Sequence, residues 1–173
     1  MTLLLALALL LAPPESRPAT ERTLLSLIQR HATRLLEGYR LPTEADIQHD
    51  WAWVRKEERR IPYRIMADFD GDGRRDYAFV LLGVRPYWVR VVALVSTGGS
   101  HKAFQLREED AGNEYSQHRY VVGVVPPGRY KALEASWFRL THPAINVSYT
   151  ESSDTFFIWD AKRGDFRAVA ISD

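Results

Sequence analysis

The chain has 173 residues, of which 46% are hydrophobic and 26% are charged, values typical of a soluble globular protein that can bury one core. It contains no cysteine, which excludes a disulfide framework, a thiolate nucleophile and any cysteine-ligated zinc or iron–sulfur site. Its 23 basic and 22 acidic residues leave a net charge of +1, so charge gives no reason to expect nucleic acid or an anionic membrane as the main partner.

The first residues form a separate unit. Residues 3–12 are an unbroken apolar run, too short to cross a bilayer but of the right length for the hydrophobic region of a signal peptide. Two prolines end the run, although no Lys or Arg precedes it, and a buried N-terminal helix or strand is the alternative. We expect residues 1–19 to be a signal peptide and linker and residues 20–173 to be a single domain. The protein would then be exported to the periplasm or the extracellular space.

The pattern that follows predicts a helix from Thr20 to Gly38. Thr20 can cap its start, and Gly38 can end it in a left-handed conformation. Apolar side chains recur at steps of three and four residues, which places them on one face: Leu24, Ile28, His31, Leu35 and Tyr39. Thr43 can cap a second, shorter helical segment. The mixed charges of residues 55–60 are expected to lie on a solvated surface.

After Pro62 the sequence changes to short segments rich in β-branched and aromatic residues, separated by turn signals. The predicted strands are residues 61–67, 77–83, 88–95, 102–106, 119–125, 144–150, 155–159 and 166–171. Connections this short cannot contain crossover helices, so the strands should pair antiparallel. The predicted fold class is α+β, with an N-terminal helical segment packed on a mainly antiparallel, twisted β-sheet.

One segment carries a chemical signal, and we call residues 68–76 the acidic loop. Asp68, Asp70, Asp72 and Asp76 occupy its first, third, fifth and ninth places, with glycines at the fourth and sixth. Alternate side chains of a curled loop can converge on one point, and glycine permits the backbone angles that curling needs. Calcium prefers six to eight hard oxygen ligands in a flexible geometry. We therefore predict a Ca²⁺ site formed by these four carboxylates, the backbone carbonyl of Arg74 and water.

The loop resembles the calcium loops of FG-GAP and VCBS-type repeats, which occur in integrin α-chain propellers and many bacterial surface proteins. The run Asp68-Phe69-Asp70-Gly71-Asp72-Gly73, followed by Asp76 and an apolar strand, carries this likeness. The resemblance implies the same five ligands, and it covers only residues 65–82. Propellers need several copies and this chain has one, so the loop is carried over without the propeller. More loosely, the layout resembles small bacterial exported proteins that share a single such loop, a likeness that implies export and supplies no activity.

Other interpretations of the acidic loop remain open. Asp and Gly are common turn residues, so a solvated turn is the simplest alternative. The haloacid-dehalogenase phosphatases use an Asp-x-Asp signature, but Asp72 stands where they carry threonine, and hairpins follow here instead of βα units. An EF-hand would need a glutamate where Phe79 stands. The five histidines are scattered without the spacing of a zinc site.

We therefore expect an exported, calcium-stabilised binding module that is not an enzyme. Its partner would be another protein or a glycan, with no nucleic acid and no stable membrane insertion after signal cleavage. The many aromatic residues are expected to build the core. Alternatively, some form an exposed patch for the partner, with Trp51, Trp53, Tyr87 and Trp88 as its members. A metal-dependent hydrolase of phosphate esters, or an inhibitor or immunity-type protein, is the alternative function.

Overall fold

The computed structural model describes residues 26–28, 30, 33–134, 136–149 and 153–171. The predicted signal peptide and the start of the first predicted helix lie outside these residues. Among the described residues, no helix is both long enough and apolar enough to cross a membrane.

Helices are short and lie before or between the strands. The described residues from 26 to 30 are helical, and the further helices are α2 (Thr33–Leu36), η1 (Glu44–Asp46, a 3-10 turn), α3 (His49–Glu57) and α4 (Glu114–Gln117). Gly38 has φ +75, as its predicted role at a helix end requires. The helical segment predicted after Thr43 is split in two. The Asp46 carboxylate accepts hydrogen bonds from the backbone N–H and hydroxyl of Thr43, which closes a single turn, and α3 then begins anew.

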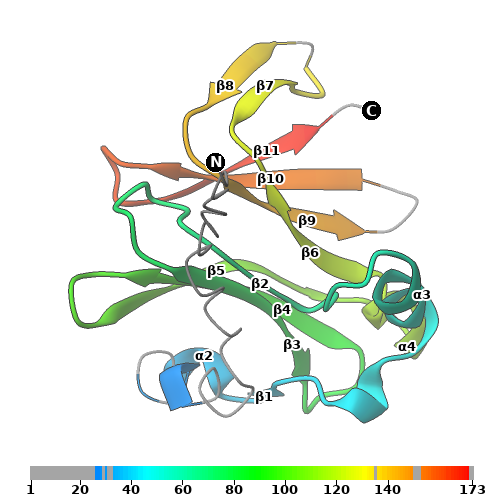
Figure 1. The fold of residues 1–173 in the computed structure, drawn as a ribbon. Coiled ribbons are helices and arrows are strands. Elements are labelled where there is room, and N and C mark those ends of the chain that lie inside the picture. Colours follow the sequence, from blue (N-terminus) through cyan, green and yellow to red (C-terminus); the bar gives the residue numbers. More distant parts are fainter. Residues whose placement is uncertain (1–25, 29, 31–32, 135, 150–152, 172–173) are drawn as a thin grey trace, which may run out of the picture.

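The strands form three sheets, all paired antiparallel (Figure 1). The first sheet has the order β1-β3-β4-β5, with β2 also paired to β3. It contains β1 (Tyr39–Arg40), β2 (Arg64–Ala67), β3 (Asp76–Gly83), β4 (Trp88–Ser96) and β5 (His101–Asp110). The second sheet, β11-β10-β9-β6, contains β6 (Tyr120–Val125), β9 (Ala144–Tyr149), β10 (Ser153–Asp160) and β11 (Asp165–Ile171). The third is the hairpin of β7 (Gly128–Lys131) and β8 (Trp137–Leu140).

The prediction of antiparallel strands with a few helices is confirmed, and each predicted strand overlaps an observed one. The prediction of one sheet is wrong. The strands form separate sheets because β3 and β4 bury side chains on both faces. One face of the first sheet packs against the second sheet, and the other packs against the N-terminal helical residues. Four observed elements correspond to no predicted one: β1, β7, β8 and α4.

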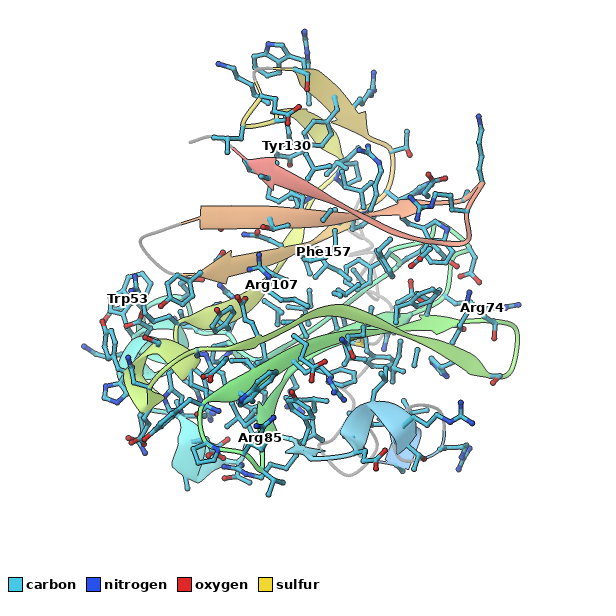
Figure 2. The ribbon with its side chains drawn as sticks, turned by 180° about the vertical axis from the view of Figure 1, so that it is seen from behind. Trp53, Arg74, Arg85, Arg107, Tyr130 and Phe157 are labelled. Atoms are coloured by element: carbon cyan, nitrogen blue, oxygen red, sulfur yellow. The ribbon has the colours of Figure 1, made fainter. Side chains whose placement is uncertain are left out.

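Three apolar clusters lie between these layers and hold them together. The largest lies between the first and second sheets, and Phe157 is placed there in Figure 2. A second cluster joins the far face of the first sheet to the N-terminal helical residues, including Ile28 and Leu35. A third lies between the second sheet and the β7–β8 hairpin, where the Tyr130 ring meets the Phe156 ring at a centroid distance of 5.3 Å. The hairpin is therefore an additional layer with its own apolar contact surface.

The hairpin also reaches the free edge of the second sheet. Ala132, just after β7, forms an isolated antiparallel bridge with Ile171 at the end of β11. The backbone N–H of Leu133 donates to the carbonyl of Ala170 at 2.9 Å. The β7–β8 connection is thus tied to the outer strand of the sheet by main-chain hydrogen bonds.

Candidate metal centre

The acidic loop is the connection of the β2–β3 hairpin. Ala67 at the end of β2 pairs with Asp76 at the start of β3, so the two ends of the loop are held together by the sheet. Gly71 and Gly73 have φ +79 and +84, the left-handed conformation that glycine adopts without strain. These two glycines allow the chain to curl between the strands, as the sequence pattern predicts.

Asp68 organises the curl by accepting hydrogen bonds from the backbone of its own loop. Its Oδ1 accepts the N–H groups of Gly71 at 2.8 Å and of Asp72 at 3.1 Å, and its Oδ2 accepts that of Gly73 at 2.9 Å. Oδ1 of Asp70 accepts the N–H of Asp72 as well, at 3.1 Å. These bonds turn the first two carboxylates toward the inside of the loop.

Asp76 is fully buried and connects the loop to the neighbouring strand. Its Oδ2 accepts the backbone N–H of Phe69 at 2.7 Å, and its Oδ1 accepts that of Ser96, at the end of β4, at 2.8 Å. Burial raises the pKa of Asp76 to about 6, and the two N–H donors oppose that shift. Burial likewise raises the pKa of Asp70. A negative charge at Asp76 is therefore costly unless further positive charge is near it.

The structure brings together three of the five predicted ligands. One carboxylate oxygen each from Asp68, Asp70 and Asp76 lies within 4.8 Å of the others. Asp72 is directed elsewhere: its Oδ1 accepts the backbone N–H of Arg74 at 2.8 Å, and its Oδ2 lies 3.6 Å from the guanidinium of the same residue. The Arg74 side chain also lies beside Gly98 in the β4–β5 turn.

The ligand atoms of this cluster suit a hard cation. All three clustered side chains offer carboxylate oxygens, the ligand type that calcium and magnesium prefer. An ionised carboxylate can accept about four hydrogen bonds or metal contacts, and Asp76 uses two of these positions for backbone N–H groups. The residues present therefore fit an oxygen-bound divalent ion, while the identity of that ion stays a prediction.

His142 is a neighbour of the loop that the sequence did not indicate. It lies in the β8–β9 turn, and its ring packs so closely on Gly71 that a Cβ added to that glycine would collide with it. No spacing pattern links these two residues, because their contact arises only when the second sheet and the hairpin pack onto the first sheet. The left-handed conformation and this contact both require glycine at position 71.

The expected aromatic patch is wrong in one of its members. Trp51 is fully buried, and its Nε1–H donates to the carbonyl of Tyr120 at 2.9 Å. Trp53 on α3 is 56% exposed and Tyr87 is 41% exposed, whereas Trp88 is half-buried. Trp51 thus belongs to the core, while two of the other candidates remain on the surface.

Comparison with known proteins adds no assignment to this geometry. The chain matches no protein-family model, no curated protein and no solved structure. The function must therefore be inferred from the loop and its surroundings.

Proposed function

We propose that the acidic loop binds one calcium ion and that this ion stabilises an exported, non-enzymatic binding module. The observation that carries the proposal is the convergence of oxygens from Asp68, Asp70 and Asp76 within 4.8 Å. Two oxygens that share one calcium ion, each at 2.3–2.6 Å, lie at most about 5 Å apart. The cluster meets this distance requirement. The carbonyl of Arg74, water and Asp72, whose side chain would have to turn away from Arg74, would complete the coordination shell.

Electrostatics supports a bound cation. Two carboxylates about 4 Å apart near a protein surface repel each other by about 4 kcal/mol at an effective dielectric constant of 20. Backbone N–H groups offset part of this repulsion, and no Lys, Arg or His side chain forms an ion pair with the three clustered carboxylates among the described residues. A divalent ion converts the repulsion into attraction. Calcium suits an irregular loop because it tolerates uneven coordination angles, whereas magnesium requires a near-octahedral site.

The proposed ion would stabilise structure at a junction of three elements. Asp76 links the loop to the end of β4, and Gly71 packs against His142 in the β8–β9 turn. Fixing a loop costs about 1–2 kcal/mol of conformational entropy per residue, which metal coordination can offset. The ion would therefore fix the position of the β8–β9 turn relative to the first sheet. The partner of this module would be another protein or a glycan.

Calcium titration of the purified protein tests the proposal. At a free calcium concentration 100 times the dissociation constant, the ion should add about 2.7 kcal/mol to the free energy of unfolding. For a chain of this size the melting temperature should then rise by about 5–11 °C. Calorimetry should show one ion bound per chain, with magnesium binding more weakly. A melting temperature that is the same with calcium and with chelator would refute the site.

A matched pair of variants separates metal binding from local turn structure. Asp70→Asn removes one clustered carboxylate, and Asp110→Asn removes a carboxylate that likewise accepts the N–H of the residue two places on. We expect Asp70→Asn to abolish most of the calcium-dependent rise in melting temperature. Asp110→Asn should retain it. Equal losses in both variants would show that the rise does not come from the cluster.

One observation favours the alternative function, a metal-dependent hydrolase of phosphate esters. Such an enzyme needs a general base near its metal, and His142 lies against the loop at Gly71. Magnesium-dependent turnover of a generic phosphate ester that Asp68→Asn abolishes would establish this function in place of the structural one. Under our proposal, the protein releases no phosphate from such an ester with either metal.

A further inference from the structure

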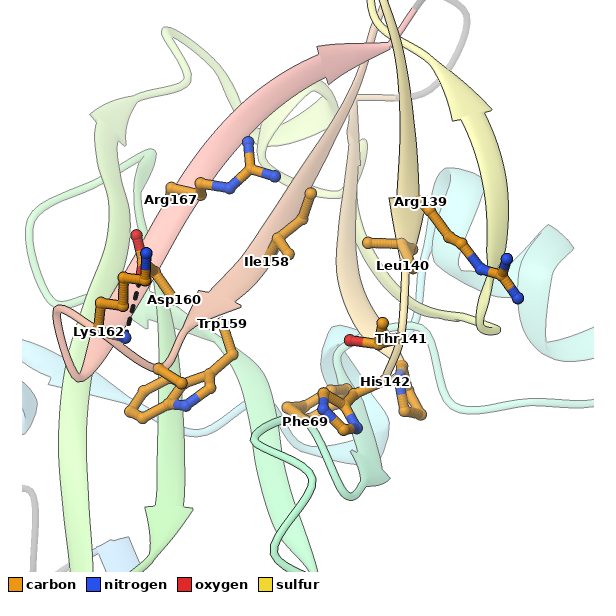
Figure 3. Close-up of a pocket in the computed structure, with 12 residues that line it drawn as sticks. Phe69, Arg139, Leu140, Thr141, His142, Ile158, Trp159, Asp160, Lys162 and Arg167 are labelled. Carbon is orange, nitrogen blue, oxygen red and sulfur yellow. Dashed lines mark hydrogen bonds between the residues drawn. The ribbon is translucent and has the colours of Figure 1, made fainter.

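A cleft of about 280 Å³ opens beside the acidic loop, and we call it the loop–hairpin cleft (Figure 3). The second sheet contributes one wall through β10 and β11. The other wall comes from β8 and the turn that follows it, and Phe69 of the acidic loop lies at the closed end. Every wall is thus part of a strand or of a short turn anchored to one. Such a cleft can hold a ligand without a large rearrangement.

The polar lining is mainly cationic. Arg139, Lys162 and Arg167 line the cleft, and none of them forms an ion pair with a carboxylate in the part of the chain that the structure describes. Figure 3 shows the Arg167 side chain on the same side of the sheet as Ile158, whereas the Arg139 guanidinium points away from the cleft. The acidic residue of the lining is Asp160, whose Oδ1 accepts the backbone N–H groups of Lys162 and Arg163 in the β10–β11 turn. Positive charge in the cleft is therefore only partly balanced.

The neighbouring hairpin adds to this positive charge. Arg129 and Arg139 stand directly opposite each other in the β7–β8 pair, and like charges in that relation destabilise a sheet. Both side chains are exposed, as are those of Lys131 and Trp137 on the same outer face. The Arg129 guanidinium lies over the Trp137 ring, 4.7 Å from its centroid. These charges lie on the outer face of the hairpin, next to the cleft but outside it.

The closed end of the cleft is aromatic and rigid. Phe69 is fully buried, and Trp159 is held by edge-on contacts with Phe104 and Phe166 at centroid distances of 5.5 and 5.2 Å. Part of the Trp159 side chain remains exposed beside His142 and is the aromatic surface that a ligand could contact, because Phe69 has no exposed surface (Figure 3). Flat apolar surface of this kind suits the carbon face of a ring-shaped ligand. A volume of about 280 Å³ lies near the lower end of the roughly 300–1,000 Å³ typical of small-molecule sites, which suits a ligand the size of one sugar ring.

We propose that the loop–hairpin cleft binds an acidic sugar, either free or as one residue of a glycan, with Arg167 as the anchor of its carboxylate. Lys162 would supply further positive charge at the rim, and Trp159 would contact the sugar ring. The inference deepens the proposed function by naming the class of partner, and it rests on that function in one respect. The calcium ion fixes Phe69 and the contact of Gly71 with His142, so it also holds one end of the cleft.

Calorimetry tests this inference. The calcium-saturated full chain is titrated with galacturonate and, separately, with galactose, the neutral counterpart of galacturonate. Galacturonate should bind with a dissociation constant of about 1 mM or below, and galactose at least about tenfold more weakly. Arg167→Gln should weaken galacturonate binding about 10- to 100-fold through loss of a charge-assisted hydrogen bond. Arg163→Gln removes a cation from the same β10–β11 turn that does not line the cleft, and it should leave the affinity unchanged. A trigalacturonide that binds more tightly than the monomer would identify a glycan as the source, and equal affinities would identify the free sugar.

Two results would overturn the inference: equal binding of galactose and galacturonate, or equal losses in the Arg163 and Arg167 variants. Absence of binding by any of the sugars would do so as well. Repeating the titration with chelator separates this inference from the proposed function. If calcium raises the melting temperature but no acidic sugar binds, only the cleft inference fails. If galacturonate binds equally with and without calcium and the melting temperature does not respond to the ion, only the calcium site fails.

Discussion

The two buried hydrogen bonds of Asp76 should contribute to stability even when no metal is bound. Asp76→Ala and Asp70→Ala each remove one carboxylate from the same cluster, and Asp76→Ala also removes the cost of a fully buried charge. They differ in what they leave behind. Without Asp76, the buried N–H of Phe69 and the partly buried N–H of Ser96 lose their acceptor, whereas loss of Asp70 affects one exposed N–H that water can satisfy. Each unsatisfied buried donor costs about 1–3 kcal/mol, and removal of the buried charge offsets part of this cost, so Asp76→Ala should be the less stable variant by about 1–3 kcal/mol.

Urea denaturation in the presence of chelator measures this difference without any contribution from calcium. The expected difference is a measurable part of the roughly 5–15 kcal/mol typical of a whole domain. It corresponds to a melting temperature lower by about 2–12 °C. The assay should be run at about pH 8, above the raised pKa of Asp76. Variants that agree within about 0.5 kcal/mol would refute the view that Asp76 connects the loop to β4.

Three further predictions concern other contacts. Gly71→Ala should lower the free energy of unfolding by about 1–2 kcal/mol through its left-handed backbone alone, and the collision with the His142 ring should add to this loss. Adding His142→Ala should recover only the part that comes from the collision. Asp46 has its pKa lowered, first by hydrogen bonds from Arg40, so it contributes stability above its ordinary pKa that is lost as the pH falls below about 4. The free energy of unfolding of Asp46→Asn should therefore fall less steeply than that of the wild type as the pH decreases below about 4. Trp51→Phe removes a donor to a main-chain carbonyl of β6 and should cost about 1–3 kcal/mol in urea denaturation.

Each of these predictions has an outcome that would contradict it. For the glycine, a His142→Ala change that restores full stability would show that the backbone conformation carries no cost. For the acid limb, a slope in Asp46→Asn as steep as that of the wild type would assign acid sensitivity to other carboxylates. For the tryptophan, the control is Trp53→Phe, an exposed position on the same helix, which should change stability by less than about 0.5 kcal/mol. Equal effects at the two tryptophans would contradict the role of the buried indole N–H.

Local patterns predicted the strands well because each is bounded by turn residues. The apolar run of β3 follows the acidic loop directly, and β4 ends at a Gly-Gly turn, so both could be located from the sequence. Their partners could not be, because a strand that is buried on both faces shows no alternation to indicate which side meets which neighbour. The β7–β8 hairpin was missed for a different reason. Its strands have four residues each, and the sequence of β8 begins with two adjacent aromatic residues, so neither strand is long enough to show a clear alternation.

The candidate site was predictable to the same extent. Aspartate and glycine spacing located the curl of the loop and the convergence of Asp68, Asp70 and Asp76, since both follow from local backbone geometry. The direction of Asp72 toward Arg74 depends on competition between hydrogen bonds within the loop, which spacing does not encode. The place of His142 depends on how the layers pack, so only the folded chain shows it.

The bridge between Ala132 and Ile171 has a consequence for how the protein behaves at high concentration. A sheet ends in a strand whose outer N–H and C=O groups are free, and such an edge readily pairs with the edge of another molecule. Here the connection of the β7–β8 hairpin occupies the end of β11, and the N–H of Leu133 fills the acceptor at Ala170. The hairpin thus protects the outer strand against intermolecular pairing. Substitutions that loosen it would promote aggregation before they cause unfolding.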